Sequence, residues 1–423
     1  MEYLTQINKS KIEKFLNYSK AIASQLNCSL LFFSFSELEN KYLQDMFLIK
    51  EDFALIVSNK VQGCFNNELN RGNFRNKHNS DIFWDNKFKS QRMRINISDF
   101  DGHAFNTNTV SGQAFSTTLF LPFTPQKIPY CQKDSKCLID SIKELRGLDN
   151  HLKGLKGLFG LEFNRLKASK YLQIKENCSL TGTSILDISA HFDGFFSLKD
   201  EILIAKISKS ALLSDLVFKR LYLAIKASKI DSEHGAYEFI KCTVKKLGLE
   251  HAFSPIVANA LNSANIHHSF SSKTPFKKGF ILVDLGVKYE GLCSDMTRMM
   301  YLGKPSLKET ELFNLVKSVQ EKSIEFVSEG LFYHHLDNYA REQFGSYSTY
   351  FTHLLGHGLG YNVHEAPSFS KTSVDIVRKN QAFTIEPGIY LKGKFGIRIE
   401  DSCYFDGIKA VPLTKTKRNL FLV

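Results

Sequence analysis

The sequence lacks the features that would place the chain in a membrane or in an oxidising compartment. Its eight cysteines include no CxxC pair and form no dense framework, which predicts reduced thiols. No stretch approaches the ~20 apolar residues that a membrane-spanning helix needs. The first twenty residues carry charges where a signal peptide would have its apolar core. We therefore expect a soluble cytoplasmic protein without a membrane partner.

A strong compositional bias is also missing. Hydrophobic residues make up 43% and charged residues 23%, close to the averages of soluble proteins, which excludes disordered and fibrous classes. The net charge of +12 is spread along the chain with no long basic run, so a solvated surface is expected and a nucleic-acid partner is not. A length of 423 residues predicts two domains.

Strand and helix patterns alternate in the first part of the chain. Residues 29–35 predict a buried strand and residues 134–145 a helix, and this alternation favours a mixed or parallel sheet covered by helices. The pattern pauses at 191–197, after which a helix with acids in its first turn begins. The predicted domains are 1–193 and 194–423.

The second part repeats one layout, which predicts a pseudo-symmetric domain. A site between its halves would receive side chains from both hairpins. Helices are predicted at about 199–229 and 232–247 before a hairpin at 280–300, and at about 306–329 and 333–344 before a second β-rich stretch ending at Tyr404.

The first hairpin carries two acids near its turn. Asp284 interrupts an apolar strand, where an isolated carboxylate would cost several kcal/mol. Gly291 can supply the positive φ of the turn, and Asp295 lies almost equally far beyond it. Antiparallel pairing would bring both carboxylates close on one face, give or take a one-residue bulge.

The second hairpin repeats this geometry. Glu386 and Glu400 each lie seven residues from Gly393, in the predicted turn, and Arg398 shares the face of Glu400. Two ordinary hairpins with surface acids, or a pair of carboxylates sharing a proton, are the alternatives for either hairpin alone.

The segment FTHLLGHGLGYNVHEAP (351–367) gathers three histidines among three glycines. Glycine at this density disfavours a helix and allows close backbone approach, which predicts an irregular loop or strand edge. A helix with His353 and His357 one turn apart, or histidines that only satisfy core hydrogen bonds, is the alternative to a metal site.

Taken together, these residues suit two divalent cations. Four carboxylates and one imidazole form an oxygen-rich set that accepts manganese, cobalt, iron or zinc, with manganese as our first expectation. Bridging carboxylates would hold the ions about 3.5–4 Å apart, and bound cations make hydroxide available near neutral pH. The set is Asp284, Asp295, His357, Glu386 and Glu400.

The order VDLG, SDMTR, GHGLGYNVHEAP, TIEPGIY and IRIED resembles the pita-bread metallopeptidases, the family of prolidase, aminopeptidase P, methionine aminopeptidase and creatinase. The motifs span about 255–401, and a weaker likeness extends through LKDEI to the N-terminal part. The resemblance implies an α/β (α+β) protein: a creatinase-like α/β domain at 1–193, a pita-bread catalytic domain at 194–423, and a homodimer.

The resemblance also implies a role for each metal-site residue. Asp284 would hold one metal ion, and His357 with Glu386 the other. Asp295 and Glu400 would bridge the two ions. Glu386 would also accept the proton of the attacking water.

Other residues that match the family's motifs would contact the substrate. His364 would stabilise the tetrahedral oxyanion. His353 and Arg398 would line the pocket for the residue after the cut bond. The family's substrate histidine falls on His267, next to His268.

The IRIED motif and the long N-terminal part resemble the proline-specific branch of this family. The implied reaction is hydrolysis of an Xaa-Pro bond at a free peptide N-terminus through a metal-bridging hydroxide, by an Xaa-Pro aminopeptidase or Xaa-Pro dipeptidase. Its substrate is a peptide with proline at the second position. The alternatives are a binding protein with this fold but no catalysis, and a metal-dependent lyase acting on a non-peptide substrate.

Overall fold

The structure is a computed structural model of the chain. It divides into two compact units, Met1–Ser189 and Ala190–Val423. It describes residues 11, 14–23, 29–34, 53–59, 115–121, 141–144, 158–163, 168–181, 184–269 and 273–423.

The first unit contains a mixed six-stranded sheet. Its strands are β1 (Ser29–Ser34), β2 (Phe53–Asn59), β3 (Phe115–Leu121), β4 (Ser141–Glu144), β5 (Leu158–Leu161) and β6 (Ser184–Asp187). Their order is β4-β3-β2-β1-β5-β6. β2 runs antiparallel to β1 and β3, whereas the pairs β1–β5, β3–β4 and β5–β6 are parallel. Residues 14–23 and α4 (Ala168–Thr181) are helical.

This unit confirms one prediction and corrects another. The strand expected at 29–35 is β1. The helix expected at 134–145 is wrong at Ser141–Glu144, which form β4 and pair with β3. Pairing along a sheet edge outweighs local helical preference here. Residues 134–140 lie outside the described part of the chain.

The second unit contains several helices, and side chains cap the starts of the longest two. The helices are α5 (Ser189–Ser197), α6 (Glu201–Lys226), α7 (Glu233–Lys246), α8 (Leu307–Phe326) and α9 (Tyr333–Phe344). Before α6, the Asp200 carboxylate accepts from the N–H groups of Ile202 and Leu203. Before α8, Ser306 and Glu309 form a reciprocal capping box. The predicted starts of both helices are confirmed to within two residues.

The strands of this unit form two larger sheets and two small ribbons, with orders β20-β12-β9-β8, β14-β13-β15-β18-β19, β11-β10-β7 and β16-β17. They are β7 (Glu250–His251), β8 (Ile256–Asn259), β9 (Gly279–Leu285), β10 (Val287–Tyr289), β11 (Leu292–Cys293), β12 (Met296–Leu302), β13 (His357–Gly358), β14 (Glu365–Ser368), β15 (Ala382–Ile385), β16 (Gly388–Leu391), β17 (Phe395–Arg398), β18 (Asp401–Phe405), β19 (Ala410–Pro412) and β20 (Phe421–Leu422).

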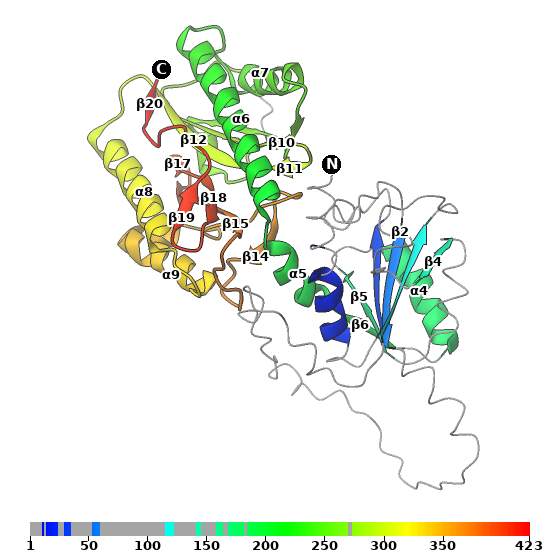
Figure 1. Cartoon of the computed structure of the whole chain (residues 1–423). Helices are drawn as coiled ribbons and strands as arrows, with labels where there is room; N and C mark the ends of the chain where they lie inside the picture. Colours follow the sequence, from blue (N-terminus) through cyan, green and yellow to red (C-terminus); the bar gives the residue numbers. More distant parts are fainter. Residues whose placement is uncertain are drawn as a thin grey trace, which may run out of the picture. The chain divides into compact units, whose positions relative to one another are not determined.

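The predicted repeat of two helices and a hairpin is confirmed. α6 and α7 precede the β9–β12 hairpin, and α8 and α9 precede the long hairpin from β15 to β18. Figure 1 shows the strands of this unit between α6 and α7 on one side and α8 and α9 on the other. The two hairpins therefore meet in the interior of the unit.

Strand β9 is buried on both faces, and its alternation decides which way Asp284 points. Phe280 and Leu282 belong to the apolar cluster with α8 and α9, whereas Ile281 and Val283 belong to the cluster with α6 and α7. Successive side chains of a strand point to opposite faces. Asp284 therefore shares the face of Phe280 and Leu282 and is directed at the second hairpin.

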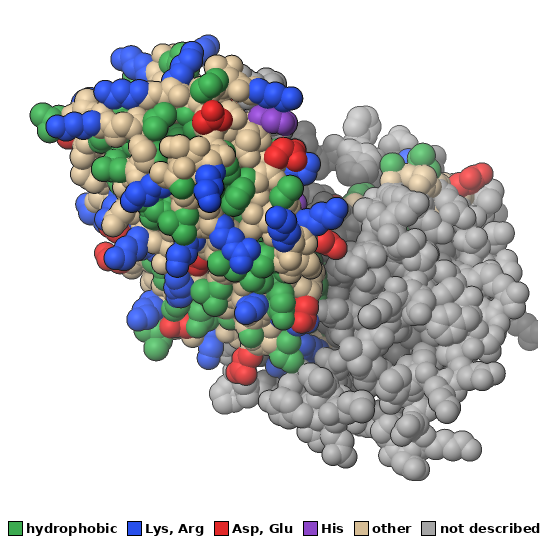
Figure 2. Space-filling view, turned by 90° about the horizontal axis from the view of Figure 1, so that it is seen from above, with side chains coloured by type: hydrophobic (Ala, Val, Ile, Leu, Met, Phe, Trp, Pro, Cys, Tyr) green, Lys and Arg blue, Asp and Glu red, His purple; other side chains and the backbone are tan. Residues whose placement is uncertain are grey.

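The charged surface of this unit shows no concentration of one kind on the face in Figure 2. Lysine and arginine side chains are scattered there among apolar and acidic ones. This pattern agrees with a solvated basic surface. Within the described residues, no helix is both long and apolar enough to span a bilayer.

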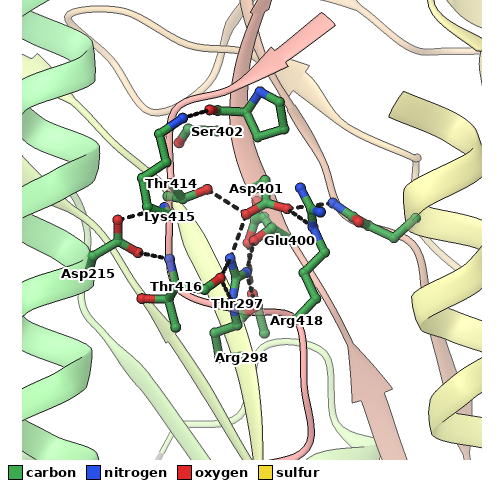
Figure 3. A network of polar contacts seen from close by, with 12 residues as sticks. Asp215, Thr297, Arg298, Glu400, Asp401, Ser402, Thr414, Lys415, Thr416 and Arg418 are labelled. Carbon is green, nitrogen blue, oxygen red and sulfur yellow. Dashed lines mark hydrogen bonds and ion pairs between the residues drawn. The ribbon is translucent and has the colours of Figure 1, made fainter. Parts of the chain in front are cut away.

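A buried charge network lies around Asp401, the residue after Glu400 (Figure 3). Its carboxylate is fully buried and pairs with Arg298 and Arg418. Thr414 and Gln320 also donate to it. The network thereby ties α8 and the C-terminal segment to β18.

Arg298 extends the network from Asp401 to neighbouring backbone. Its guanidinium is 1% exposed and donates to the carbonyl oxygens of Thr297, Glu400 and Thr416. Burial raises the pKa of Asp401, but the two arginines outweigh it and leave the pKa below its usual range. The carboxylate therefore stays charged and holds both hairpins together.

Replacing this carboxylate should destabilise the fold. Asp401→Asn leaves Arg298 buried without its counter-charge, which costs about 3–5 kcal/mol in the free energy of unfolding. A carboxylate whose pKa is lower in the folded state than the unfolded-state pKa of about 4 stabilises the fold at pH values above that unfolded-state pKa. This stabilisation is lost as the pH falls through the native pKa. Urea unfolding should therefore give a constant difference between the two proteins from pH 7 to 5, shrinking below about pH 4.

Glu311→Gln is the matched control because Glu311 pairs with Lys308 on the surface of α8, with side chains 67% and 63% exposed. Its unfolding should match the wild type. A loss in Asp401→Asn no larger than in this control would contradict the assigned role of the network.

Candidate metal centre

The first hairpin brings its two acids to one face with an offset. Asp284 lies directly opposite Thr297 in the β9–β12 register, and the same register continues through the β10–β11 pair. Asp295 is therefore a diagonal neighbour of Asp284, two positions nearer the turn, without a bulge. Glu290 and Gly291 form the turn with φ of 48° and 83°, so the expected positive φ at Gly291 is confirmed.

The second hairpin places its acids directly opposite each other. Ile385 pairs with Asp401 and Gly388 with Arg398. Between these pairs the chain passes from one sheet to the other, and the register puts Glu386 across from Glu400. Gly393 occupies the turn with φ of 75°. The equal spacing of Glu386 and Glu400 from Gly393 thus corresponds to antiparallel pairing, as predicted.

Hydrogen bonds join the two hairpins at the acids. Thr297 Oγ1 donates to Glu400 Oε2 over 2.7 Å, and the Glu400 N–H donates to the Thr297 carbonyl oxygen over 3.2 Å. The Ser402 hydroxyl accepts from the Asp295 N–H at 2.9 Å and donates to the Asp295 carbonyl oxygen at 2.7 Å. The backbones at Asp295 and Glu400 are therefore fixed relative to each other.

The glycine-rich segment delivers His357 to these acids. It is irregular, as predicted, and not helical: His357 lies in the two-residue strand β13. A Cβ atom on Gly356 would lie 2.0 Å from the Thr384 carbonyl oxygen, and one on Gly358 would lie 2.1 Å from the Ala366 carbonyl oxygen. Only glycine permits this approach.

The ring of His357 is oriented by its own loop. Its Nδ1 lies 3.1 Å from the Gly358 carbonyl oxygen, a contact in which Nδ1 carries the proton. Its Nε2 then faces Glu386 Oε1 at 3.3 Å and Asp295 Oδ2 at 3.7 Å. Ligand atoms of Asp295, His357 and Glu400 lie within 4.8 Å of one another. His357 Nε2 is thus the ring nitrogen that would bind a cation, in place of the proton that it shares with Glu386.

Arg398 crosses the same space. Its guanidinium donates to Asp284 Oδ2 at 2.7 Å, to Thr297 Oγ1 at 3.0 Å and to the Tyr390 hydroxyl at 2.8 Å. His353 Nε2 lies 2.9 Å from the same hydroxyl. Tyr390 and Thr297 were not predicted from the sequence. Thr297 shares the strand face of Asp295, a signal that was present, whereas the place of Tyr390 depends on tertiary contacts.

The remaining histidines divide into two groups. The rings of His364 and His357 are in contact, with centroids 4.2 Å apart. Burial and then the charge of His357 lower the pKa of His364, Glu386 opposes them, and His267 adds a smaller lowering effect. His268 instead lies 3.1 Å from the buried carboxylate of Glu233.

The surroundings shift the pKa values of the four acids in different directions. Burial and then neighbouring carboxylates raise the pKa of Asp295 and Glu400 well above the usual range. Burial also raises the pKa of Asp284, against the opposing effect of Arg398. For Glu386 burial acts the same way, but the hydrogen bond and charge of His357 outweigh it and bring the pKa to about 2. Without a bound cation, the raised pKa values therefore favour protonation of Asp284, Asp295 and Glu400.

The oxygens of the cluster fit divalent cations. Three of them are buried and find no hydrogen-bond partner among the residues that the structure describes, namely Asp284 Oδ1, Asp295 Oδ1 and Glu400 Oε1. Buried carboxylate oxygens are ordinarily paired or coordinate a metal. Such oxygens together with one imidazole nitrogen suit Mn²⁺, Co²⁺, Fe²⁺ or Zn²⁺.

Comparison with known proteins agrees with this chemistry. The sequence model of metallopeptidase family M24 matches residues 205–406. The Xaa-Pro dipeptidase of Pyrococcus horikoshii is 30% identical over 309 residues, which cover 72% of this chain and 86% of that protein. The chain belongs to metallopeptidase family M24.

Solved structures of a prolidase and an X-Pro aminopeptidase match about three quarters of the chain. The prolidase of Thermococcus sibiricus superposes with a TM-score of 0.62 at 30% identity, covering 73% of this chain and 85% of that one. The X-Pro aminopeptidase of Thermotoga maritima gives 0.59 at 30% identity, covering 74% and 90%. This M24 chain therefore has the pita-bread fold, and membership of the family implies use of a divalent metal.

The metal-free M24 protein should lose stability as the pH rises. A carboxyl group whose native pKa lies above its unfolded-state pKa of about 4.3 does not lower the free energy of unfolding at pH values below both. As the pH rises from the unfolded-state pKa toward the native pKa, the group lowers the free energy of unfolding by a growing amount. Glu400→Gln removes one such group. In EDTA, the unfolding free energy of the variant should fall less between pH 5 and pH 8 than that of the wild type, measured by urea unfolding.

Glu311→Gln again provides the control and should run parallel to the wild type. Equal slopes for wild type and Glu400→Gln would mean that Glu400 is not protonated in the metal-free fold.

Proposed function

We propose that the chain is a dinuclear-metal peptidase that hydrolyses Xaa-Pro bonds at a free peptide N-terminus. The observation that carries the proposal is the set of four carboxylates and His357, brought together by two hairpins and one loop with three buried oxygens left without a partner among the described residues. The 30% identity to an Xaa-Pro dipeptidase supports proline specificity. Residues 194–423 would form the catalytic domain and 1–193 the N-terminal domain.

The proposed metal ligands follow the arrangement of the site. Asp284 would hold one ion, His357 and Glu386 the other, and Asp295 with Glu400 both. The ions, with manganese ahead of cobalt, zinc and iron, would polarise the scissile carbonyl and lower the pKa of water. Arg398 donates to Asp284 Oδ2 and so orients that carboxylate, with Oδ1 directed to its ion.

The residues of this chain would move the proton and stabilise the charge. Glu386 would accept the proton of the attacking water and pass it to the leaving proline nitrogen, which ends the reaction as a secondary amine. His364, in ring contact with His357, would donate to the oxyanion of the tetrahedral intermediate. His353 and Arg398 meet at Tyr390 and would line the pocket for the proline ring.

Metal-loaded wild-type protein should cleave Ala-Pro or Ala-Pro-Gly and leave Ala-Ala intact. His357→Ala removes a metal ligand and Glu386→Gln the proton acceptor, so each should lower kcat/KM by about 10²–10⁴-fold. Metal analysis should find two ions per chain in the wild type and fewer in His357→Ala. Cleavage of Ala-Pro alone assigns a dipeptidase, and cleavage of Ala-Pro-Gly an aminopeptidase.

Glu311→Gln should retain full activity in the same assays. Turnover that survives in both His357→Ala and Glu386→Gln would rule out this mechanism, and two bound ions without proline-peptide cleavage would point to a non-peptide substrate.

The two adjacent histidines should respond differently to substitution. His267→Ala should lower kcat/KM by about tenfold or more with little change in thermal midpoint, because the ring would meet substrate. His268→Ala breaks the contact with Glu233 and should lower the thermal midpoint. The reverse pattern would transfer the substrate role to His268.

A further inference from the structure

A lysine is buried beside the loop that carries His364. The side chain of Lys199 is 0% exposed, and its Nζ lies 3.2 Å from Glu365 Oε2, whose own side chain is 8% exposed. The ammonium also donates to the Phe196 carbonyl oxygen at 2.6 Å, in the last turn of α5, where a cation is favoured. Burying an ammonium group is costly, so this position requires good geometry around it.

Contacts of the backbone at Lys199 and of its neighbours hold this residue in place. Leu198 forms an isolated bridge with Gln381, and the Lys199 N–H donates to the Asn380 carbonyl oxygen at 2.8 Å. Gln381 in turn donates to the Ser197 hydroxyl at 3.1 Å. These contacts anchor Lys199 to the residues that lead into β15.

Glu365 uses its two oxygens to close the loop around His364. Oε1 accepts from the Asn362 N–H at 2.7 Å, and Oε2 faces Lys199. Glu365 also pairs with Gly358 across β13 and β14, next to His357. The chain is therefore held two residues before His364 and directly after it.

We infer that Lys199 is a positioning residue for His364, acting through Glu365. Without the ammonium group, Glu365 would lose its ion pair with Lys199 at Oε2, and the loop from Gly360 to Glu365 would hold the imidazole less firmly. The inference deepens the proposed function and rests on it for its catalytic consequence, whereas the order of the loop is a property of this chain alone.

The test compares four variants with the wild type. Lys199→Met and Glu365→Gln each remove one charge, and the double variant removes both. Lys206→Met is the matched control because Lys206, seven residues further on in α6, pairs with an exposed Glu290, with side chains 27% and 53% exposed. Each protein is measured for kcat and KM on Ala-Pro, thermal midpoint, and amide hydrogen exchange at 360–365.

Lys199→Met should lower kcat by about 10- to 100-fold with KM within about threefold of the wild type, because the oxyanion forms only after substrate binds. Amides at 360–365 should exchange faster than in Lys206→Met. The double variant removes both charges of the pair and so restores the charge balance, and its thermal midpoint should recover toward the wild type while kcat stays low.

Each remaining outcome overturns one claim. If kcat recovers with stability in the double variant, or if exchange at 360–365 does not change in Lys199→Met, Lys199 does not position the loop. If the metal-loaded wild type cleaves no Xaa-Pro peptide, the proposed function is wrong, and the exchange data alone then decide whether Lys199 orders the loop.

Discussion

The crowding of four carboxylates, three of them buried and that of Glu386 partly buried, is the constraint on which the rest of this structure depends. Arg398 reaches Asp284, and His357 reaches Glu386, so two of the four acids have a cationic partner. The pKa of Glu400 is raised well above its usual range by burial and then by the other acids, and the same holds for Asp295. Such a cluster is stable only with protons or with added cations, and the family to which the chain belongs uses divalent metals.

The pairing of the strands explains why these carboxylates lie close together. Asp295 and Asp284 lie on one face because their hairpin has a two-residue turn and an unbroken register. Glu386 and Glu400 face each other where the second hairpin passes between two sheets. A one-residue slip in either hairpin would turn its acids toward an apolar cluster, so the same registers that form the core also form the site.

Much of this could be predicted from the sequence, because period and turn chemistry are local. An acid inside an apolar strand, glycine turns, and equal spacing around Gly393 indicated two acidic hairpins. The two-residue offset between Asp284 and Asp295 was not foreseen, since it depends on where the turn closes. Tyr390 and the Lys199–Glu365 pair were invisible for a different reason: residues far apart in sequence create their environments.

A common arrangement follows two residues of the proposed site, Glu400 and His364. Glu400 is followed by Asp401, which pairs with buried Arg298, and His364 is followed by Glu365, which pairs with buried Lys199. Neighbours on an extended chain point to opposite sides, so the second acid can anchor the backbone while the residue before it faces the site. Buried ion pairs add little net stability over apolar packing, but they tolerate few alternative geometries. Their presence one residue beyond the site is therefore better explained by positioning than by stability.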